Sequence, residues 1–380
     1  MDIFKFHTPS GSGEDTHLVG GGEYVNGLKT KEWVDRYRDP GSITLTSRAD
    51  RGIREFLPEG TLVGMRGSTS VMMIEDHQLS DDGDAIVTTT GRSLEAFLEN
   101  RIVRYGLDSE GQLKFNANPQ WLSWVQAKSL IERQIIQTTT GNDRIKYLEV
   151  VDSVGMDPRT ATREGRSVAR GELYSAVKGI LDVDNIGWMI VRPGPWSIAE
   201  DPVNNIALVL HSGVDRRSQI TMSYESGDID SADYLWSIQK YRNAAIVYGK
   251  WVTESIGDTI SRGLQRRVLY VDANDIDEGQ TSGTGWSDEI KAWIKVAMKS
   301  RGREALAARR RISLASVTPA RNAQTYIYGR DYDIGDIVTV RGNFSESRVM
   351  RVMEHVYIED ENGEFGYPTL EVLEDPQEVA

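Results

Sequence analysis

The stretch EGTLVGMRG, Glu59–Gly67, returns near the other end of the chain as IGDIVTVRG, Ile334–Gly342. Four of the nine positions are identical, and two more exchange one apolar residue for another. Each copy is followed by an apolar strand that contains a glutamate, then by an Asp-Gly or Asn-Gly pair, then by a second strand. Because these dipeptides are strong hairpin signals, the sequence predicts the same small β-unit twice. The alternative is chance, since glycine and valine are common in many strands and turns.

The residues around each copy also favour strands. Gly41–Ser47 alternates apolar and polar residues and places Ile43 and Leu45 on one face. Such a run of short strands is typical of a small barrel or sandwich. In the second copy, the segment SRVMRVMEHVYIE predicts one strand with four apolar side chains on one face: Met350, Val352, Val356 and Ile358.

The middle of the chain mixes helical and strand patterns. Short apolar runs such as GWMIV, NNIALVLHSG and YRNAAIVYGKW predict strands there. Helical spacing of apolar residues occurs in four segments, which are Leu94–Ile102, Trp121–Ile136, Ser167–Leu181 and a segment that begins at Ser287. The fold class expected is therefore α+β, with two related small β-barrel domains at the N- and C-terminal ends and a mixed α/β region between them.

The same patterns divide the chain into three expected domains. Residues 1–92 would form the N-terminal barrel, with strands around 204–225 as a possible completion of it. Residues 93–203 would form an inserted α/β domain. Residues 240–380 would form the second barrel, with a helical insertion around 286–311.

The composition argues against several kinds of chemistry. The chain has no cysteine, which excludes disulfides, thiolate zinc sites and a cysteine nucleophile. Its five histidines include no pair at metal-binding helical spacing, and no nucleophile-elbow or phosphate-loop motif is present. No run of residues approaches the length of an apolar membrane span, so we expect no stable membrane insertion. We predict no enzymatic activity, no catalytic residues, no cofactor and no metal.

Two histidines occupy comparable places in the two copies. His77 lies near Glu75, and His355 follows Glu354. One interpretation is a paired acid–base site. The other, which we favour, is the polar face of a half-exposed strand.

Several stretches occur in a fixed order along the chain. They are YRDPGSITLT, LPEGTLVGMRG, GRSLEAFLENRIV, DYLWSIQKYRNAAIVYG, RGREALAARR, YGRDYDIGDIVTVR and RVMEHVYIEDENG followed by PTLEV. Taken together, they resemble the tail hub proteins of long-tailed bacteriophages, which are relatives of the baseplate hub of contractile tails. The resemblance covers most of the chain, and the stretch from Tyr328 to Leu370 is its most specific part.

The resemblance implies a structural role at the tail tip of the virion, after assembly in the host cytoplasm. Hub proteins of this type form homotrimers whose six similar barrels meet a sixfold distal tail ring. Implied partners are therefore that ring, the tape measure protein, and other tail-tip or receptor-binding proteins. DNA would only pass through the channel, and the net charge of −13 would keep it from adhering. The chain ends soon after the second β-unit, so we expect no added lytic domain.

In this interpretation the functional sites are surfaces between barrels. The expected ring-interface residues are Arg66, Arg341, Glu75 and Glu354, with the two arginines in equivalent environments. An alternative function is a receptor- or carbohydrate-binding protein of the tail tip, which the numerous aromatic residues would serve. A hydrolase with dispersed carboxylates is a third possibility, and it would require two carboxylates with split pKa values in one cleft.

Overall fold

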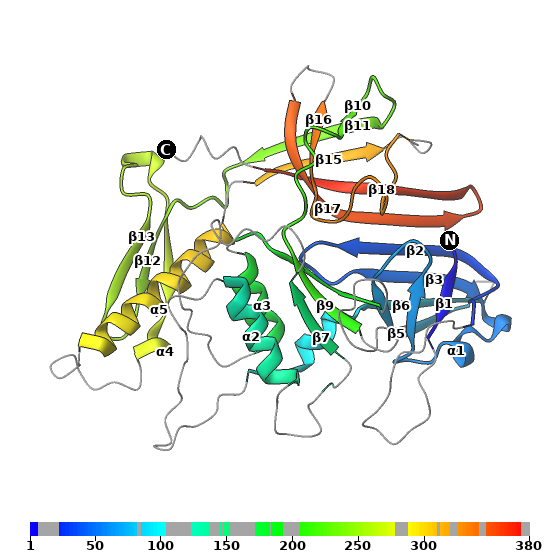
Figure 1. Ribbon diagram of the computed structural model, residues 1–380, viewed down its shortest axis with the longest axis horizontal. Coiled ribbons are helices and arrows are strands. Elements are labelled where there is room, and N and C mark those ends of the chain that lie inside the picture. Colours follow the sequence, from blue (N-terminus) through cyan, green and yellow to red (C-terminus); the bar gives the residue numbers. More distant parts are fainter. Residues whose placement is uncertain are drawn as a thin grey trace.

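A computed structural model describes most of the chain. The N-terminal strands form one continuous sheet with the strands of the last third of the chain, and a mixed α/β part lies to the left of the N-terminal strands and below the C-terminal ones in the view of Figure 1. No described helix is long and apolar enough to cross a membrane. The described residues are 1–6, 23–81, 85–103, 123–136, 145, 148–152, 172–182, 184–192, 206–277, 288–309, 312–319, 325–341 and 347–373.

The N-terminal unit contains six strands and two short helical turns. Its strands lie in the sheet in the order β1-β4-β5-β6-β3-β2. Alternation is clear in β6 and β3, where every second residue is buried, Ile43 and Leu45 included. The elements are β1 (Ile3–Lys5), β2 (Leu28–Arg36), β3 (Ser42–Arg48), η1 (Ala49–Arg51), α1 (Ile53–Phe56), β4 (Leu62–Met65), β5 (Val71–Ser80) and β6 (Ile86–Ser93).

The middle region packs two helices against a three-stranded sheet of order β7-β9-β8. In that sheet β7 and β9 are parallel, whereas β8 and β9 are antiparallel. One core cluster joins these helices and strands to the N-terminal unit. The elements are η2 (Leu94–Asn100), α2 (Ser123–Ile131), the π-helical turn η3 (Glu132–Ile136), β7 (Leu148–Asp152), α3 (Leu173–Asp182), β8 (Gly187–Val191) and β9 (Ile206–His211).

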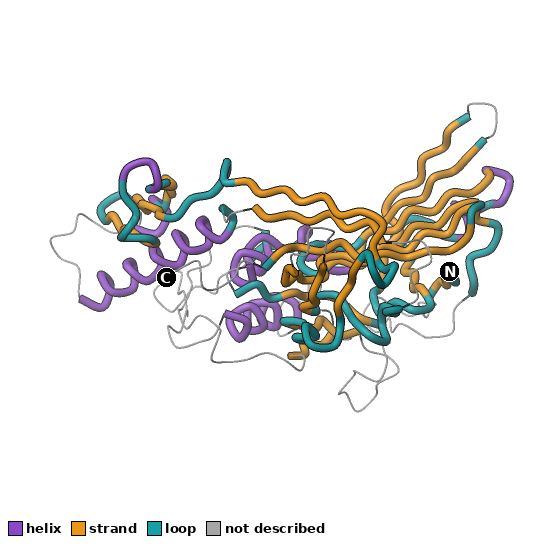
Figure 2. Tube along the Cα trace, turned by 90° about the horizontal axis from the view of Figure 1, so that it is seen from above, coloured by secondary structure: helices purple, strands orange, loops and turns teal. Residues whose placement is uncertain are grey.

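The C-terminal unit continues the large sheet. It is interrupted between β11 and β15 by a separate subdomain, in which α5 packs against the sheet β13-β12-β14. Figure 2 shows a two-stranded ribbon running from the large sheet toward this helical part. The elements are β10 (Thr221–Ser223), β11 (Ile229–Ser237), β12 (Ala244–Tyr248), β13 (Thr253–Gly257), η5 (Gly263–Gln265), β14 (Val268–Asp272), α4 (Asn274–Asp277), α5 (Asp288–Ala307), β15 (Ile312–Pro319), β16 (Ile337–Arg341), β17 (Ser347–Asp360) and β18 (Gly363–Val372).

The repeat seen in the sequence extends to five strands. In chain order, β2, β3, β4, β5 and β6 correspond to β11, β15, β16, β17 and β18, and each set has the same neighbours in the sheet. Two bulges coincide. The β2–β3 pairing shifts register between Leu28 and Thr30, as the β11–β15 pairing does between Ile229 and Ser231. The pairing of β5 with β6 shifts after Ile74, and that of β17 with β18 shifts after the corresponding Val352.

The turn before β4 in the first repeat has the same geometry as the turn before β16 in the second. Gly60 and Gly335 both have left-handed backbones, with φ of 85° and 90°. The Gly60 N–H donates to the carbonyl of Ile74 at 2.7 Å, and the Gly335 N–H donates to that of Val352 at 2.8 Å. Shared glycine geometry, bulges and strand order together exclude a chance likeness of two hairpins.

The structure corrects several expectations of the sequence analysis. The fold is α+β and mostly sheet, but the large sheet does not close into a barrel within the described residues. The segment after Ser93 is the short 3-10 helix η2, and Ile102 is exposed rather than on a buried helical face. The strands near 204–225 pair elsewhere, β9 with β7 and β8, and β10 with β16.

A bulge also changes the expected face of β17. Met350 and Val352 lie in the core, but the register shift after Val352 breaks the two-residue alternation. As a result His355 and Val356 are both buried, and Ile358 is only half-buried. The sequence pattern assumed an unbroken period of two and therefore placed Val356 and Ile358 with Met350.

A buried carboxyl joins two elements of the middle region, η2 and β8. Glu95 of η2 is 3% exposed, and its Oε1 accepts the backbone N–H of Ile190 in β8. Burial raises the pKa of Glu95 to about 7. A raised folded-state pKa contributes stability below the unfolded value and loses it as pH rises through the folded value.

We therefore expect Glu95→Gln to stabilise the protein at high pH. Between the unfolded pKa of 4.5 and pH 8 the wild-type carboxyl must ionise in a buried place, which costs up to about 3 kcal/mol. The variant should match the wild type near pH 4 and exceed it near pH 8 in urea unfolding. Glu59→Gln is the matched control, because that side chain is half exposed. A constant difference across this pH range would contradict the buried ionisation.

Candidate assembly site

The two repeats meet along one antiparallel strand pair, β2 with β17. The pairing runs from Lys31 opposite Glu359 to Arg36 opposite Glu354. Both of these pairs form ion pairs, at 2.8 Å between Lys31 Nζ and Glu359 Oε1 and at 2.7 Å between Arg36 Nε and Glu354 Oε1. Trp33 lies opposite Tyr357 and is fully buried. The seam therefore combines an apolar centre with charged pairs at its two ends.

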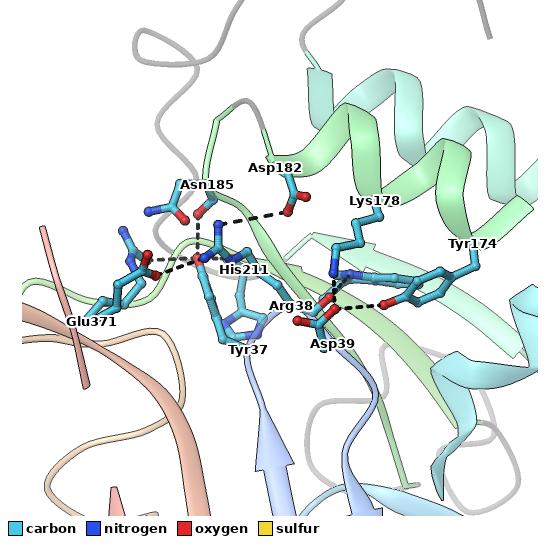
Figure 3. A network of polar contacts seen from close by, with 11 residues as sticks. Tyr37, Arg38, Asp39, Tyr174, Lys178, Asp182, Asn185, His211 and Glu371 are labelled. Atoms are coloured by element: carbon cyan, nitrogen blue, oxygen red, sulfur yellow. Dashed lines mark hydrogen bonds and ion pairs between the residues drawn. The ribbon is translucent and has the colours of Figure 1, made fainter. Parts of the chain in front are cut away.

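Tyr37, the residue after β2, joins three parts of the chain (Figure 3). Its backbone N–H donates to the carbonyl of Met353 at 2.8 Å, and its carbonyl accepts the N–H of Trp188 at 3.1 Å. Its hydroxyl donates to the carbonyl of Asn185 at 2.8 Å and accepts from Arg351 Nη1 at 2.9 Å. The first repeat, the middle region and the second repeat are thus fixed at one side chain.

The same junction is lined by further polar groups. His211 stands edge-on to Tyr37, with ring centroids 5.1 Å apart. Burial, with a smaller contribution from the Arg351 charge, lowers the pKa of His211 to about 4, so the ring is neutral at pH 7. Arg38 donates to Glu371 at 2.9 Å, and Lys178 forms an ion pair with Asp39 (Figure 3).

The residues predicted for a ring interface lie at strand ends and bulges. Arg66 follows β4 and Arg341 ends β16, so they occupy corresponding positions, and both are exposed. Their neighbours differ. Arg66 contacts Asp2 at 3.3 Å beside the antiparallel β1, whereas Arg341 pairs with Ser223 of the parallel β10.

The two glutamates have different environments. Glu75 lies at the β5 bulge and binds Arg92 of β6 through two hydrogen bonds, at 2.8 and 3.0 Å. Glu354 corresponds in register to Asp76 rather than to Glu75, and it binds Arg36 across the seam. Of the four residues, Glu354 alone is seen to join the two repeats.

The two histidines correspond in register but do not form an acid–base pair. His77 is half-buried, and its ring nitrogens lie 2.9 Å from Thr89 Oγ1 and from the Leu57 carbonyl. His355 is buried and stacks on Tyr328, with centroids 4.1 Å apart. Burial lowers the pKa of His355 to about 3. The half-exposed polar face that we expected holds for His77 and is wrong for His355.

The described residues give no support to a catalytic site. They contain no group of three side chains placed to hold a metal ion. The carboxyl of Asp35 has a pKa raised by burial, yet it is 2% exposed and accepts hydrogen bonds from Trp33 and Ser68. These bonds hold the first repeat together, so a substrate would not reach this carboxyl.

The junction at Tyr37 was missed by the sequence analysis. One signal for it was present, since Arg351 is a charge inside the apolar run VMRVM. A charged residue in such a run is buried with partners or points to solvent, and the register of β17 decides between them. The partners come from residues far along the chain, which the pattern could not provide.

Comparison with known proteins places the fold among phage tail proteins. A family model described as Siphovirus ReqiPepy6 Gp37-like protein matches residues 15–367. Curated protein sequences contain no match. Among solved structures, a tail protein from Neisseria meningitidis MC58 has a TM-score of 0.57 at 14% identity, covering 94% of this chain and 95% of the other.

Two further structures have the same fold. The 43 kDa tail protein of prophage MuSo2 from Shewanella oneidensis has a TM-score of 0.55 at 13% identity and covers both chains fully. The prophage tail protein gp18 from Listeria monocytogenes EGD-e has a TM-score of 0.52 at 8% identity, covering 99% of this chain and 95% of the other. At these identities the likeness concerns the fold.

Proposed function

The chain belongs to the Siphovirus ReqiPepy6 Gp37-like protein family, and from this premise we propose that it is the trimeric hub of a siphovirus tail tip. It is a structural phage tail protein and so a component of the virion. The observation that carries the proposal further is the five-strand repeat, with its shared bulges and glycine turn.

A repeated unit suits a symmetry adapter. Three identical chains cannot present one identical surface to each of six partners, but three chains with two similar units each can nearly do so. We propose that the two units act as the two related barrels of a six-unit ring, completed on assembly. The partners would be a sixfold distal tail ring, the tape measure protein and other tail-tip or receptor-binding proteins.

The proposed domains follow the repeat. Residues 1–92 would be the first ring unit, 93–203 the inserted α/β domain, and 240–380 the second unit with its helical insertion. The pairing of β10 and β11 with second-unit strands supports moving the start of that unit toward residue 221. All four interface residues, Arg66, Arg341, Glu75 and Glu354, stay predictions, and Glu354 additionally binds Arg36 across the seam within the chain.

The first experiment is the solution mass by light scattering at two protein concentrations. A mass near three times 42.5 kDa is the expected result. If the protein stays a monomer, the purified distal tail ring is added. A chain that remains monomeric and unbound with that ring present would overturn the trimeric hub.

The net charge supports a channel through which DNA slides. A chain with a formal charge of −13 repels phosphates on average, and we propose that acidic residues line the lumen. A map of the assembled ring would show which residues face the lumen. A basic lumen would contradict this part of the proposal.

A second candidate is receptor or carbohydrate binding at the tail tip. Tyr248 and Tyr270 stack on the exposed face of the β12–β14 sheet, with centroids 5.2 Å apart, and Trp251 nearby in the chain is 47% exposed. Exposed aromatic faces suit stacking on sugar rings. We expect Tyr270→Ser to abolish any binding to host cell-wall polysaccharide without changing the solution mass. Equal binding by both proteins would argue against this candidate.

A further inference from the structure

Within one chain, the contact between the two repeats uses one specific edge from each. In this contact, Glu354–Glu359 of β17, which follow the bulge, pair with one edge of β2. The other edge of β2 pairs with β3. The carbonyl of Met353, at the bulge itself, accepts the N–H of Tyr37. This contact provides a template for how one repeat joins the next.

The corresponding edges of the other two strands have no strand partner among the described residues. After its bulge, β5 pairs with β6 on one side only, because β4 ends its pairing at Met73. Likewise β11 is the last strand of the sheet and pairs only with β15. Within the part of the chain that the structure describes, two edges therefore lack a strand partner: the β5 edge that corresponds to β17, and the β11 edge that corresponds to β2.

The open edge of β5 is exposed in a way that proteins normally avoid. Asp76, Gln78, Leu79 and Ser80 are all exposed, and Leu79 is 63% exposed. An open strand edge with an exposed apolar side chain is a template for pairing with another chain. An edge of this kind is expected to be covered in the assembled protein.

The repeat fixes which residues would face each other. Matching bulges align Asp76 with Glu354 and Leu79 with Tyr357. Matching bulges in the other pair of strands align Trp33 with Tyr234 and Arg36 with Ser237. Because Trp33 lies opposite Tyr357 within the chain, Tyr234 would lie opposite Leu79.

We propose that β11 of one copy pairs antiparallel with β5 of the next copy, in the register of β2 with β17. This inference rests on the proposed trimer and specifies its contact. The register places Ser237 opposite Asp76 and Tyr234 opposite Leu79. Repeated around three copies, it links all six repeats through alternating contacts within and between chains.

The two kinds of contact differ in chemistry. Within the chain, Arg36 forms an ion pair with Glu354. At the corresponding place between chains, Ser237 would lie opposite Asp76, so no ion pair would form there. Likewise, the ion pair of Lys31 with Glu359 within the chain corresponds to Ala232 opposite Asp81 between chains. The contact between chains thus rests on backbone hydrogen bonds and on the covering of apolar groups such as Leu79. It should depend little on salt concentration.

Paired cysteines test the register, since the chain has none of its own. In the variant with Leu79→Cys and Tyr234→Cys, mild oxidation should link chains into a covalent trimer on a non-reducing gel. Gln78→Cys with Leu235→Cys is a second pair from the same register. The matched control is Leu79→Cys with Asp230→Cys, which moves one sulfur about 13 Å along the strand, beyond the reach of a disulfide.

Mixing two single variants shows that the link joins different chains. A chain with only Leu79→Cys and a tagged chain with only Tyr234→Cys should give covalent dimers that contain one of each. The same oxidation of either chain alone should give none. Such a result supports pairing between copies and excludes a link within one chain.

The outcomes separate this inference from the proposed function. A trimer by light scattering without the covalent link would overturn the strand pairing and leave the hub standing. Specific links in assemblies that grow beyond three chains would support the strand pairing and overturn the closed trimer. A monomer that gives no link at any concentration would overturn the pairing, and the distal tail ring would then decide the hub. Equal linking in the control pair would also overturn the register.

Discussion

Replacing Tyr37 by alanine should lower the free energy of unfolding by about 3–5 kcal/mol, the range for removing a large buried aromatic side chain. Tyr37 is fully buried and contacts His211, Arg351 and Gly335. Its ring fills the space where the two repeats and the middle region meet. The cavity left by alanine would lie at this junction, where partial collapse would disturb all three parts.

Tyr37→Phe separates the hydroxyl from the ring. It removes the acceptor for Arg351 Nη1 and the donor to the Asn185 carbonyl, which should cost about 1–3 kcal/mol. Arg351 keeps the carbonyls of Ser212 and Gly335, at 2.6 and 3.0 Å, so its charge stays partly bonded. The phenylalanine variant should therefore fall between the wild type and the alanine variant.

Urea unfolding measures these effects, and hydrogen exchange locates them. Amides of β8, β9 and the first half of β17 should lose protection in Tyr37→Ala before those of β12 and β13. Tyr270→Ala, at a side chain 66% exposed, is the control and should change stability by no more than about 0.5 kcal/mol. A loss from Tyr37→Ala as small as that of the control would show that the junction does not hold the three parts together.

Gly335→Ala should cost roughly 3–5 kcal/mol, whereas the corresponding Gly60→Ala should cost only about 1–2 kcal/mol. Both glycines have a left-handed backbone, so both substitutions carry the same conformational strain. At Gly335 a Cβ would also lie 2.4 Å from Tyr37 Cε2, but at Gly60 no described atom lies within 4 Å. The difference between the two variants therefore measures the packing around Gly335, which Tyr37 dominates and to which His211 contributes at 3.3 Å.

The repeat thus supplies its own matched control. Thermal unfolding of the two variants, prepared side by side, gives the comparison. Adding Tyr37→Leu to Gly335→Ala should recover part of the loss, because the smaller side chain makes room for the methyl group. Equal losses from the two glycine variants would mean that the backbone relaxes around Tyr37.

The sequence predicted the repeat correctly because its signals are local. Gly60 and Gly335 are needed for a left-handed turn, and the alternation of Ile43 and Leu45 gives the strand and its buried face. The prediction from sequence failed where the register or burial of a residue depends on a partner that is distant in the sequence. The bulge after Val352 depends on β18, and the burial of His355 depends on Tyr328 stacking on it.

The candidate site was harder to predict than the fold. Glu354 was expected at a ring interface, which stays a prediction; within the chain it binds Arg36 across the seam. Tyr37 was not identified. Nothing near Tyr37 in the sequence marks it, because its partners lie about 150 and 310 residues further along. Such a residue is found only when the long-range pairing of β2 and β17 is known.

The subdomain between β11 and β15 has no counterpart between β2 and β3, where only residues 37–41 connect the strands. A ring of six identical chains would have to carry such an appendage at every position or at none. Because one chain holds both units, the connection between the first two strands of a unit can differ between the units. In the proposed trimer, three such subdomains would project from a ring of six similar units, so the subdomains could vary in sequence while the ring units kept their shared contacts.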